Sequence, residues 1–405
     1  MTDDNEAVRC ERERWITDTS YAAAKDAKKL IDKLRKGGDA RTAVEFGEEA
    51  FSLWPTYKIV QGALAWAYYD RDIKVLDPET ATDSQRNVAK ASLARVQQLE
   101  DVDPYSEYSA WPQAVLKLAH GLVSNSAADA LDLLIAVDPL QLSAEQTSDF
   151  PVSKAERWHM YVTKALGKLE RWDELLSRCD RALALDGILS RDNRVWIKRR
   201  RGLALEGLGR LSDAAIVLRE VCLEKPTWSN EADLARVLEG AGMKDEAIGA
   251  CRRALSEPGS LAWRWKTVFR LARLLENADK DLAGLHYQFA SHLRVEAGWK
   301  PRQDLEESSR SIGLGGDPPK SVALKDLRAY WSSHDDSSRT SGVVTKVFTG
   351  DHSGFVTSDE GMTGIYFNMP QPPVTVGSRV TFRMAESFDK KKNQPGMKAV
   401  DIRGE

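Results

Sequence analysis

The chain has 405 residues, of which 42% are hydrophobic and 29% are charged, and its formal net charge is -3. This ordinary globular composition supports a sizeable core, and the length suits two or three domains. No apolar run approaches the ~20 residues that a bilayer-spanning helix needs, which argues against an integral membrane protein.

The N-terminal segment MTDDNEAVRC is polar and shows no signal-peptide pattern. The four cysteines are scattered, and no two of them form a C-x-x-C pair. Cys179, Cys222 and Cys251 fall within predicted helices, where cysteine packs as a small apolar side chain. We therefore expect a reducing, cytoplasmic setting for this protein.

From about residue 20 to residue 300, apolar side chains recur at helical spacing and no convincing strand appears. A frame of glycine, alanine and proline markers returns within this region, which indicates an internal repeat. Leu175 and Ala214 are 39 residues apart in this frame, and Ala214 and Ala247 are 33 residues apart. The frame occurs in GGDARTAVEFGEEAFSLWP, ERWDELLSRCDRALALDG, GRLSDAAIVLREVCLEKP and GMKDEAIGACRRALSEPG.

Helix packing explains these markers. A glycine or tight turn lets one helix reverse into a second, and a small residue such as Ala214 or Ala247 lets the two approach closely. These units resemble tetratricopeptide (TPR) repeats, a resemblance that implies an α-solenoid over residues 1–303 whose first helices line a groove. The likeness is most specific over 158–187, 196–226 and 228–259.

The TPR resemblance places a set of side chains on the groove. They are Arg157, Lys164, Trp196, Arg199, Arg236, Trp263, Lys266, Arg270 and Arg273. Trp265 stands at the family's core tryptophan position, so we expect it to be buried. Because such arrays mostly bind peptides, the resemblance implies protein partners in the groove.

Charge is distributed unevenly along the repeats. Residues 1–190 carry 24 Lys and Arg against 32 Asp and Glu, whereas residues 191–303 carry 21 against 15. The basic second segment suits an anionic partner, either a nucleic acid or an acidic peptide.

Residues 304–340 are predicted to form a linker, because Ser308 to Lys320 and Ser332 to Ser341 are rich in serine and other polar or turn-forming residues. Between these stretches, apolar residues at helical spacing predict a short amphipathic helix that docks on the C-terminal domain or on the last repeat. They are Val322, Leu324, Leu327, Tyr330 and Trp331.

Residues 341–405 contain five β-branched and aromatic runs that predict short strands. The runs cover about 343–348, 354–357, 365–369, 379–384 and 398–402. Five short strands in about 60 residues suit a small OB-type barrel. Because side chains alternate along a strand, we expect Phe367 to point into this barrel and Tyr366 to point outward.

This segment resembles a cold-shock domain and, nearly as closely, the OB repeat of the largest ribosomal protein of the small subunit. The first RNP motif of the cold-shock family falls on residues 351–356, DHSGFV, and the second falls on residues 365–369, IYFNM. Phe355 and Tyr366 retain the family's stacking rings. Three ring positions are lost, at Val347, Ser353 and Met369.

The resemblance implies binding of RNA or single-stranded DNA, because aromatic side chains stack on bases and basic side chains follow phosphates. The residues expected at this interface are Lys346, Phe348, Phe355, Tyr366, Asn368, Arg379, Arg383, Lys390, Lys391 and Lys392. The alternative is that Phe355 and Phe367 are both core and that the barrel docks protein. Eight Lys and Arg against seven Asp and Glu in this segment favour a modest affinity for the barrel alone.

Common enzyme motifs are missing from the sequence: it contains no G-x-x-x-x-G-K-[ST], no H-E-x-x-H and no G-x-S-x-G. The six histidines are dispersed, and His286 and His292 do not share one helical face. We expect neither catalysis nor a bound cofactor or metal.

We therefore expect a mainly α protein with a TPR-like solenoid at 1–303, a linker at 304–340 and a cold-shock-like OB barrel at 341–405. The hypothesis is a non-enzymatic adaptor that binds RNA or single-stranded DNA through the barrel and recruits protein through the groove. This combination resembles components of bacterial conflict systems, which implies antiviral defence beside a nuclease, helicase or NTPase. The alternatives are a pure protein-interaction scaffold and a ribosome-associated translation factor.

Overall fold

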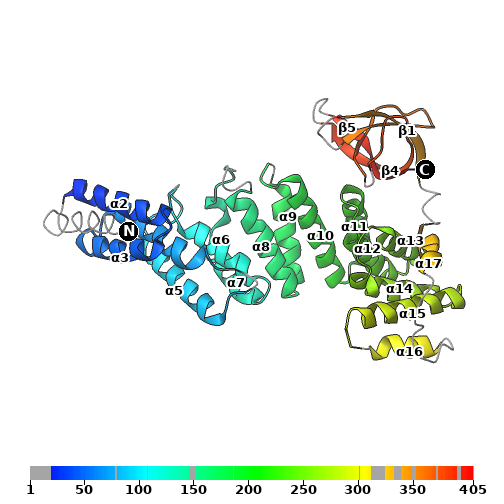
Figure 1. The fold of residues 1–405 in the computed structure, drawn as a ribbon, viewed down its shortest axis with the longest axis horizontal. Coiled ribbons are helices and arrows are strands. Elements are labelled where there is room, and N and C mark those ends of the chain that lie inside the picture. Colours follow the sequence, from blue (N-terminus) through cyan, green and yellow to red (C-terminus); the bar gives the residue numbers. More distant parts are fainter. Residues whose placement is uncertain are drawn as a thin grey trace. The chain divides into compact units, whose positions relative to one another are not determined.

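The structure is a computed structural model of the chain. It describes residues 20–77, 80–106, 108–145, 152–185, 187–300, 302–311, 324–332, 339–348, 353–370, 373–389 and 394–404. These residues form a mainly helical TPR-like repeat domain and a small C-terminal five-stranded β-barrel (Figure 1). The chain divides into two compact units, Met1–Arg200 and Arg201–Glu405.

The first unit consists of successive helical hairpins. Its helices are α2 (Tyr21–Lys36), α3 (Ala40–Leu53), α4 (Lys58–Tyr68), α5 (Asp83–Leu99), α6 (Trp111–Leu122), α7 (Ala127–Ile135), α8 (Lys154–Lys168), α9 (Trp172–Ala184) and α10 (Arg191–Gly207), which runs into the second unit. A π-helical turn, Tyr69–Ile73, continues α4. Side chains cap several helix starts, as where Thr82 and Gln85 form a reciprocal capping box at α5.

The second unit continues the hairpins. Its further helices are α11 (Leu211–Glu224), α12 (Trp228–Gly240), α13 (Lys244–Ser256), α14 (Trp265–Leu275), α15 (Lys280–Glu296), α16 (Gln303–Ser311) and α17 (Leu324–Ser332). The first helices of four successive hairpins, α8, α10, α12 and α14, begin at residues 154, 191, 228 and 265, so each begins 37 residues after the last. This constant spacing, close to the 34-residue TPR period, is typical of a TPR-like array.

Small residues lie where the two helices of a hairpin cross. Ala214 and Ala247, predicted as points of close approach, are fully buried. A Cβ at Gly202 of α10 would lie 2.8 Å from the Leu218 side chain of α11, which is closer than packed atoms come. Glycine at this position therefore allows α10 and α11 to pack tightly.

Helix α17 is the short helix predicted in the linker, and it packs against α13 and α15 in the second unit. The buried Trp331 donates its indole N–H to Nε2 of His286 at 2.9 Å, while Nδ1 of His286 lies 2.7 Å from the Leu282 carbonyl oxygen. The guanidinium of Arg252 lies 4.0 Å from the ring centroid of Tyr330. Because Nε2 accepts a hydrogen bond, the His286 ring is neutral with its proton on Nδ1.

The five strands close into a barrel in the order β1-β2-β3-β5-β4. They are β1 (Thr340–Val347), β2 (Ser353–Ser358), β3 (Ile365–Asn368), β4 (Arg379–Asp389) and β5 (Gln394–Gly404). β3 and β5 run parallel, and the other neighbouring pairs are antiparallel. The last two strands extend beyond their predicted ends, because they pair with each other along a long hairpin that starts at Asp389 and Gln394.

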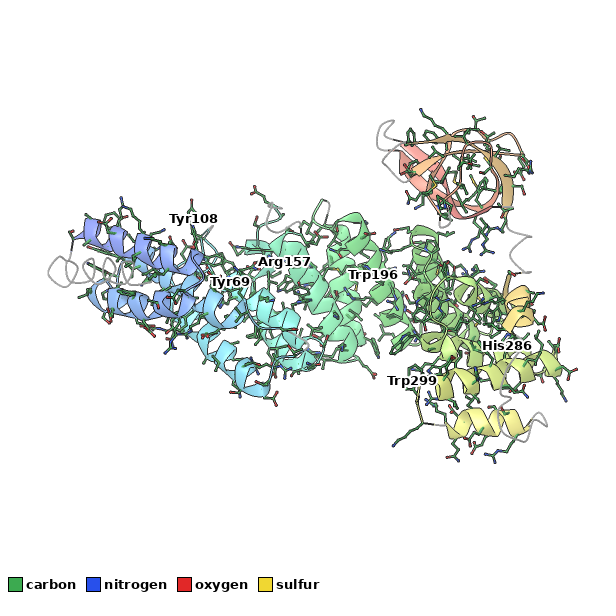
Figure 2. All side chains as sticks on the ribbon, in the orientation of Figure 1. Tyr69, Tyr108, Arg157, Trp196, His286 and Trp299 are labelled. Atoms are coloured by element: carbon green, nitrogen blue, oxygen red, sulfur yellow. The ribbon has the colours of Figure 1, made fainter. Side chains whose placement is uncertain are left out.

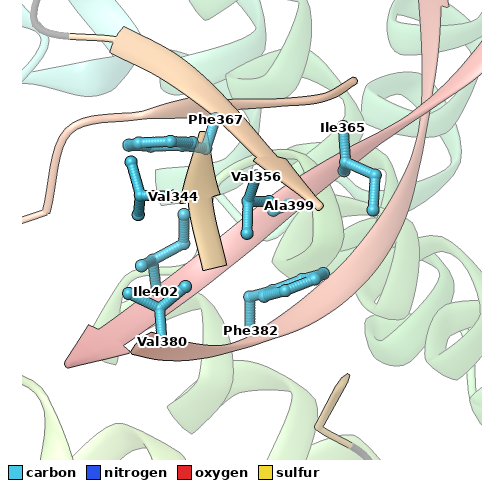
Figure 3. Packing of buried hydrophobic residues seen from close by; sticks show 8 residues of the cluster. All are labelled: Val344, Val356, Ile365, Phe367, Val380, Phe382, Ala399 and Ile402. Carbon is cyan, nitrogen blue, oxygen red and sulfur yellow. The ribbon is translucent and has the colours of Figure 1, made fainter. Parts of the chain in front are cut away.

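Buried apolar side chains from all five strands fill the barrel (Figure 3). They are Val344, Val356, Ile365, Phe367, Val380, Phe382, Ala399 and Ile402. Phe367 is 0% exposed and Tyr366 is 38% exposed, which confirms the predicted alternation along β3. Val347 and Met369, two of the positions without a family ring, pack against this core.

Cys179, Cys222 and Cys251 are buried in helices, as the sequence predicts. Burial raises the pKa of Cys251 to about 12, so this thiol stays protonated and packs as an apolar group. Cys10 lies outside the described residues. Within the described parts of the chain, no helix is both long and apolar enough to cross a membrane.

Gly354 of β2 allows two barrel strands to approach. A Cβ there would collide with the backbone carbonyl of Lys346 and lie 2.8 Å from the Phe367 ring. We expect Gly354→Ala to destabilise the barrel by about 1–3 kcal/mol, with faster hydrogen exchange of barrel amides and unchanged exchange in the repeats. Gly404→Ala is the matched control, since a Cβ there meets no atom within 4 Å. Equal losses in the two variants would contradict the packing argument.

His286 makes the docking of α17 sensitive to acid. Burial lowers the pKa of His286 to about 4, below the ~6.5 of a solvated imidazole. Stability from the neutral ring is present above pH 6.5 and is lost as the pH falls toward 4. Between pH 7 and pH 5, we expect α17 docking to weaken by about 2 kcal/mol, roughly thirty-fold in the protection of residues 324–332 against hydrogen exchange.

A matched pair of substitutions on α15 tests this assignment. His286→Gln should remove most of the change in protection, after correction for the intrinsic exchange rate at each pH. His292→Gln changes a half-buried histidine of the same helix and should leave the change intact. An acid response that survives His286→Gln would assign the sensitivity to another group.

Candidate nucleic-acid interface

Three predicted stacking residues lie together on the outer face of the barrel. Phe355 on β2 pairs across the strands with Tyr366 on β3, and their ring centroids are 6.1 Å apart. Phe348, directly after β1, packs edge-on against Phe355 with centroids 5.3 Å apart. We call Phe348, Phe355 and Tyr366 the aromatic strip.

Strand alternation leaves the aromatic strip partly accessible. On β2, Val356 points into the core and the neighbouring Phe355 points outward, where it is half-buried. Phe348 is also half-buried, and Tyr366 is exposed. The alternative that Phe355 and Phe367 are both core therefore holds for Phe367 and not for Phe355.

Lysines border the aromatic strip on both sides. Lys346 of β1 pairs with Phe355, and its Nζ lies 5.0 Å from the ring centroid of Phe348. Lys398 of β5 pairs with Tyr366 across the parallel ladder. Lys346, Phe355, Tyr366 and Lys398 thus form one row across four neighbouring strands. Lys398 is only 6% exposed, so it adds positive charge beside the strip but little accessible surface.

Sequence reasoning missed Lys398 although it predicted the strand that carries it. The order of the strands in the barrel decides which residues are neighbours in this row. In that order, β5 lies between β3 and β4. A local sequence pattern does not show which residues lie opposite one another when two strands that are distant in sequence pair in parallel. Strand alternation together with the strand order of an OB-type barrel would have been the usable signal.

The other predicted barrel residues are placed as follows. Asn368 is exposed beside the strip, and its Oδ1 accepts a hydrogen bond from the Tyr366 hydroxyl at 3.1 Å. Arg379 forms an ion pair with Asp359 at 2.7 Å, which engages its guanidinium away from the strip. Lys390, Lys391 and Lys392 lie outside the described residues.

Arg383 is the least accessible of the predicted phosphate-binding residues. Its side chain is 15% exposed and lies 3.8 Å from the buried carboxylate of Glu231 on α12. Arg253 of α13 pairs with the same carboxylate at 3.0 Å. Arg383 therefore serves an ion-pair network in the second unit, and no described contact joins it to the aromatic strip.

Three predicted groove arginines of the second unit form ion pairs with glutamates of the preceding first helix. Arg236 of α12 forms two hydrogen bonds with Glu206 of α10, at 2.6 and 2.7 Å. Arg270 and Arg273 of α14 both bind Glu239 of α12, at 2.7 and 2.8 Å. These ion pairs offset the positive charge of three of the basic residues of segment 191–303.

Trp263, Lys266 and Arg199 each lie near a tryptophan ring, and Figure 2 labels two of these tryptophans, Trp299 and Trp196. Trp263 is 69% exposed and lies against Trp299, with ring centroids 5.3 Å apart. Lys266 stands over Trp265, which is buried as expected for the family's core position. On α10, the Arg199 guanidinium lies 5.4 Å from the Trp196 ring centroid.

Arg157 and Lys164, the predicted groove residues of the first unit, lie on one face of α8 because they are seven residues apart. Arg157 donates to the side-chain oxygen of Gln113 on α6 at 2.8 Å. Burial lowers the pKa of both groups. Among the described residues, no group of three or more His, Cys, Asp or Glu side chains could hold a metal ion.

No family model matches the sequence, and no curated protein matches it. Similar solved structures include a tetratricopeptide repeat protein from Parabacteroides merdae, at 10% identity, a TM-score of 0.36, and coverage of 71% of this chain and 98% of that chain. A human IFIT1 dimer with PPP-AAAA is 17% identical, with a TM-score of 0.38 and coverage of 72% and 61%. The Rap conjugation gene regulator of the plasmid pLS20, in complex with the Phr* peptide, is 12% identical, with a TM-score of 0.36 and coverage of 76% and 83%. At these identities the likeness concerns the fold alone.

Substitution of Glu239 tests whether the ion pairs of the groove stabilise the repeats. Glu239→Gln leaves Arg270 and Arg273 without their carboxylate, and we expect a loss of about 2 kcal/mol in the free energy of unfolding. Denaturant titration followed by tryptophan fluorescence measures this loss. Glu246→Gln is the control, because its ion pair with Arg219 is exposed and should cost at most about 1 kcal/mol.

Proposed function

We propose that the chain is a non-enzymatic adaptor that binds RNA or single-stranded DNA on the aromatic strip of its barrel. The row of Lys346, Phe355, Tyr366 and Lys398 is the observation that carries this proposal. Each base stacked on an aromatic ring contributes roughly 1–3 kcal/mol with little dependence on sequence. The exposed Lys346 beside the rings attracts a phosphate between the bases, and the buried Lys398 adds positive charge on the other side.

The barrel topology supports an OB-type, cold-shock-like assignment. Strand order β1-β2-β3-β5-β4, with β3 parallel to β5, closes a five-stranded barrel of the kind that binds oligonucleotides on the face of its second and third strands. Phe355 and Tyr366 stand on those two strands. The topology and the position of the rings therefore favour the same face.

The repeat groove suits a protein partner in this proposal. Glu206 and Glu239, together with Asp233, form ion pairs with Arg236, Arg270 and Arg273, which offsets the positive charge that would favour a polyanion there. A peptide of a nuclease, helicase or NTPase is the partner that the resemblance to bacterial conflict systems implies. A pull-down from the native host that recovers none of these would count against the antiviral defence role.

The competing candidate is a scaffold whose barrel docks protein. The engagement of Arg379 by Asp359 and of Arg383 by Glu231 favours it, because two of the predicted phosphate-binding cations are already paired. In this alternative the aromatic strip forms the centre of a protein interface, and single strands do not bind.

Fluorescence anisotropy of labelled single-stranded RNA and DNA against the full-length protein, at several salt concentrations, tests the proposal. We expect Phe355→Ala with Tyr366→Ala to weaken binding roughly thirty-fold or more, because two base stacks are lost. Lys346→Ala should lower the slope of log affinity against log salt by about 0.7, the value for one phosphate on a single strand.

Two variants control for the loss of the rings. Tyr366→Phe keeps the ring and should retain most of the binding, and Val376→Ala changes an exposed apolar residue in the turn before β4. If neither strand binds the wild-type protein even at low salt, the barrel is a protein-docking module and the proposal fails.

A further inference from the structure

Five cationic or titratable side chains gather on the first helices of three successive hairpins in the first unit. They are Lys117 and His120 of α6, Arg157 and Lys164 of α8, and Arg200 of α10, which we call the cationic cluster. Spacings of three residues on α6 and seven residues on α8 keep each pair on one helix face. In a TPR-like array, the faces of the first helices line the groove.

Contacts between α6 and α8 hold one side of the cationic cluster. The His120 ring stacks on Tyr161 with centroids 5.0 Å apart and an interplanar angle of 29°. Arg157 donates to Gln113 at 2.8 Å, and the Gln113 amide donates to the hydroxyl of Tyr69 at 3.2 Å. Figure 2 marks Arg157 and Tyr69 in this unit. The partners in these contacts are neutral groups.

The contact between α8 and α10 is also made with neutral acceptors. Nη1 of Arg200 donates to the Met160 carbonyl oxygen at 3.2 Å and to the Thr163 hydroxyl at 3.0 Å. Within the described residues, no hydrogen bond engages Nε or Nη2 of Arg200, so these N–H groups can serve an incoming acceptor.

The positive charges of the cationic cluster act on one another. Burial, then Lys164, Lys117 and Arg157, lower the pKa of His120. Burial, then Arg200 and Lys168, lower the pKa of Lys164, and burial lowers that of Arg200 to about 10. In the part of the chain that the structure describes, Lys117, His120, Lys164 and Arg200 form no ion pair with a carboxylate.

Two comparisons within the chain show that the positive charge of the cationic cluster does not follow from a basic sequence alone. Residues 101–200, which include the whole cluster, carry 13 Lys and Arg against 15 Asp and Glu, so carboxylates are plentiful in this region. In the second unit, Glu206 and Glu239 lie on the first helix beside the three predicted groove arginines and form ion pairs with them. Between α8 and α10, the corresponding contact of Arg200 uses the neutral Met160 carbonyl and Thr163 hydroxyl.

Like charges held half-buried without a counter-ion destabilise the free protein, and a bound anion relieves that cost. A phosphate group fits better than a carboxylate, because it brings up to two negative charges and three acceptor oxygens to one point. Carboxylates on one face of an extended peptide bring one charge every ~6.6 Å. The stacked rings of His120 and Tyr161 add an aromatic surface beside the cations, as a base requires.

We infer that the cationic cluster is a binding site for a phosphate-bearing ligand, which is either a free nucleotide or the backbone of a single nucleic-acid strand. This inference goes beyond the proposed function, because the barrel takes no part in it.

The test uses the full-length protein, with pyrophosphate and a twelve-residue oligouridylate RNA as probes in isothermal titration calorimetry. Lys117→Gln with Lys164→Gln removes two charges whose side chains make no hydrogen bond or ion pair within the described residues. We expect this double variant to bind pyrophosphate at least about tenfold more weakly. Without ligand it should melt at the same or a higher temperature, because repulsion is relieved.

Lys29→Gln with Lys90→Gln is the matched control, since it removes two exposed cations that pair with Asp26 and Asp129 in the same unit. It should bind pyrophosphate like the wild type. Equal affinity for pyrophosphate and RNA would identify a free nucleotide or phosphate as the ligand, and much tighter RNA binding that the cluster variant weakens would identify the strand backbone. Phe355→Ala with Tyr366→Ala should leave pyrophosphate binding unchanged, so the barrel proposal can fail separately.

Two results would overturn the inference. One is unchanged pyrophosphate binding, or none at all, in both the wild type and the double variant. The other is an octaglutamate peptide that binds the wild type more tightly than pyrophosphate and RNA do, which would assign the cationic cluster to an acidic protein partner.

Discussion

Close approach of the two helices in each hairpin is the constraint on which the repeat domain depends. Ala214, Ala247 and Gly202 let the helices pack so tightly that each hairpin has a fixed geometry. First helices then recur every 37 residues along the second half of the array. Side chains on neighbouring first helices consequently meet in fixed pairs, as Glu206 meets Arg236. The charge of the groove is therefore decided by pairs between repeats rather than by overall composition.

The same geometry yields two different surfaces. In the second unit, the predicted groove arginines form ion pairs with glutamates of the neighbouring first helix. These pairs offset the positive charge of the arginines. In the first unit, Arg200 donates instead to a neutral hydroxyl, that of Thr163, and within the described residues Lys117, Lys164 and Arg200 form no ion pair with a carboxylate. A few side chains on a common scaffold thus give the proposed protein site and the proposed phosphate site different charge.

Local periodicity explains which features the sequence could predict. Spacings within one or two elements predict three features: the helical repeats, the small residues at helix crossings, and the orientation of Phe367 and Tyr366. Partners that are distant in sequence could not be predicted. Glu206 lies 30 residues from Arg236, and Lys398 joins the aromatic row only through a parallel pairing between β3 and β5. The cationic cluster combines side chains of three helices, so the sequence predicted Arg157 and Lys164 for the groove but not Lys117, His120 or Arg200 beside them.

The docking of α17 limits the length of chain between the last anchored helix and the barrel. Eight residue steps separate Ser332 from Thr340, so an anchored α17 limits their separation to about 29 Å. From Ser311, the end of α16, the distance to Thr340 is 29 steps, or at most about 100 Å. Once the contact between Arg383 and Glu231 is also open, release of one buried indole from one imidazole would therefore enlarge the volume that the barrel can reach roughly fifty-fold. The local concentration of the barrel near any ligand held by the repeats would fall by a similar factor.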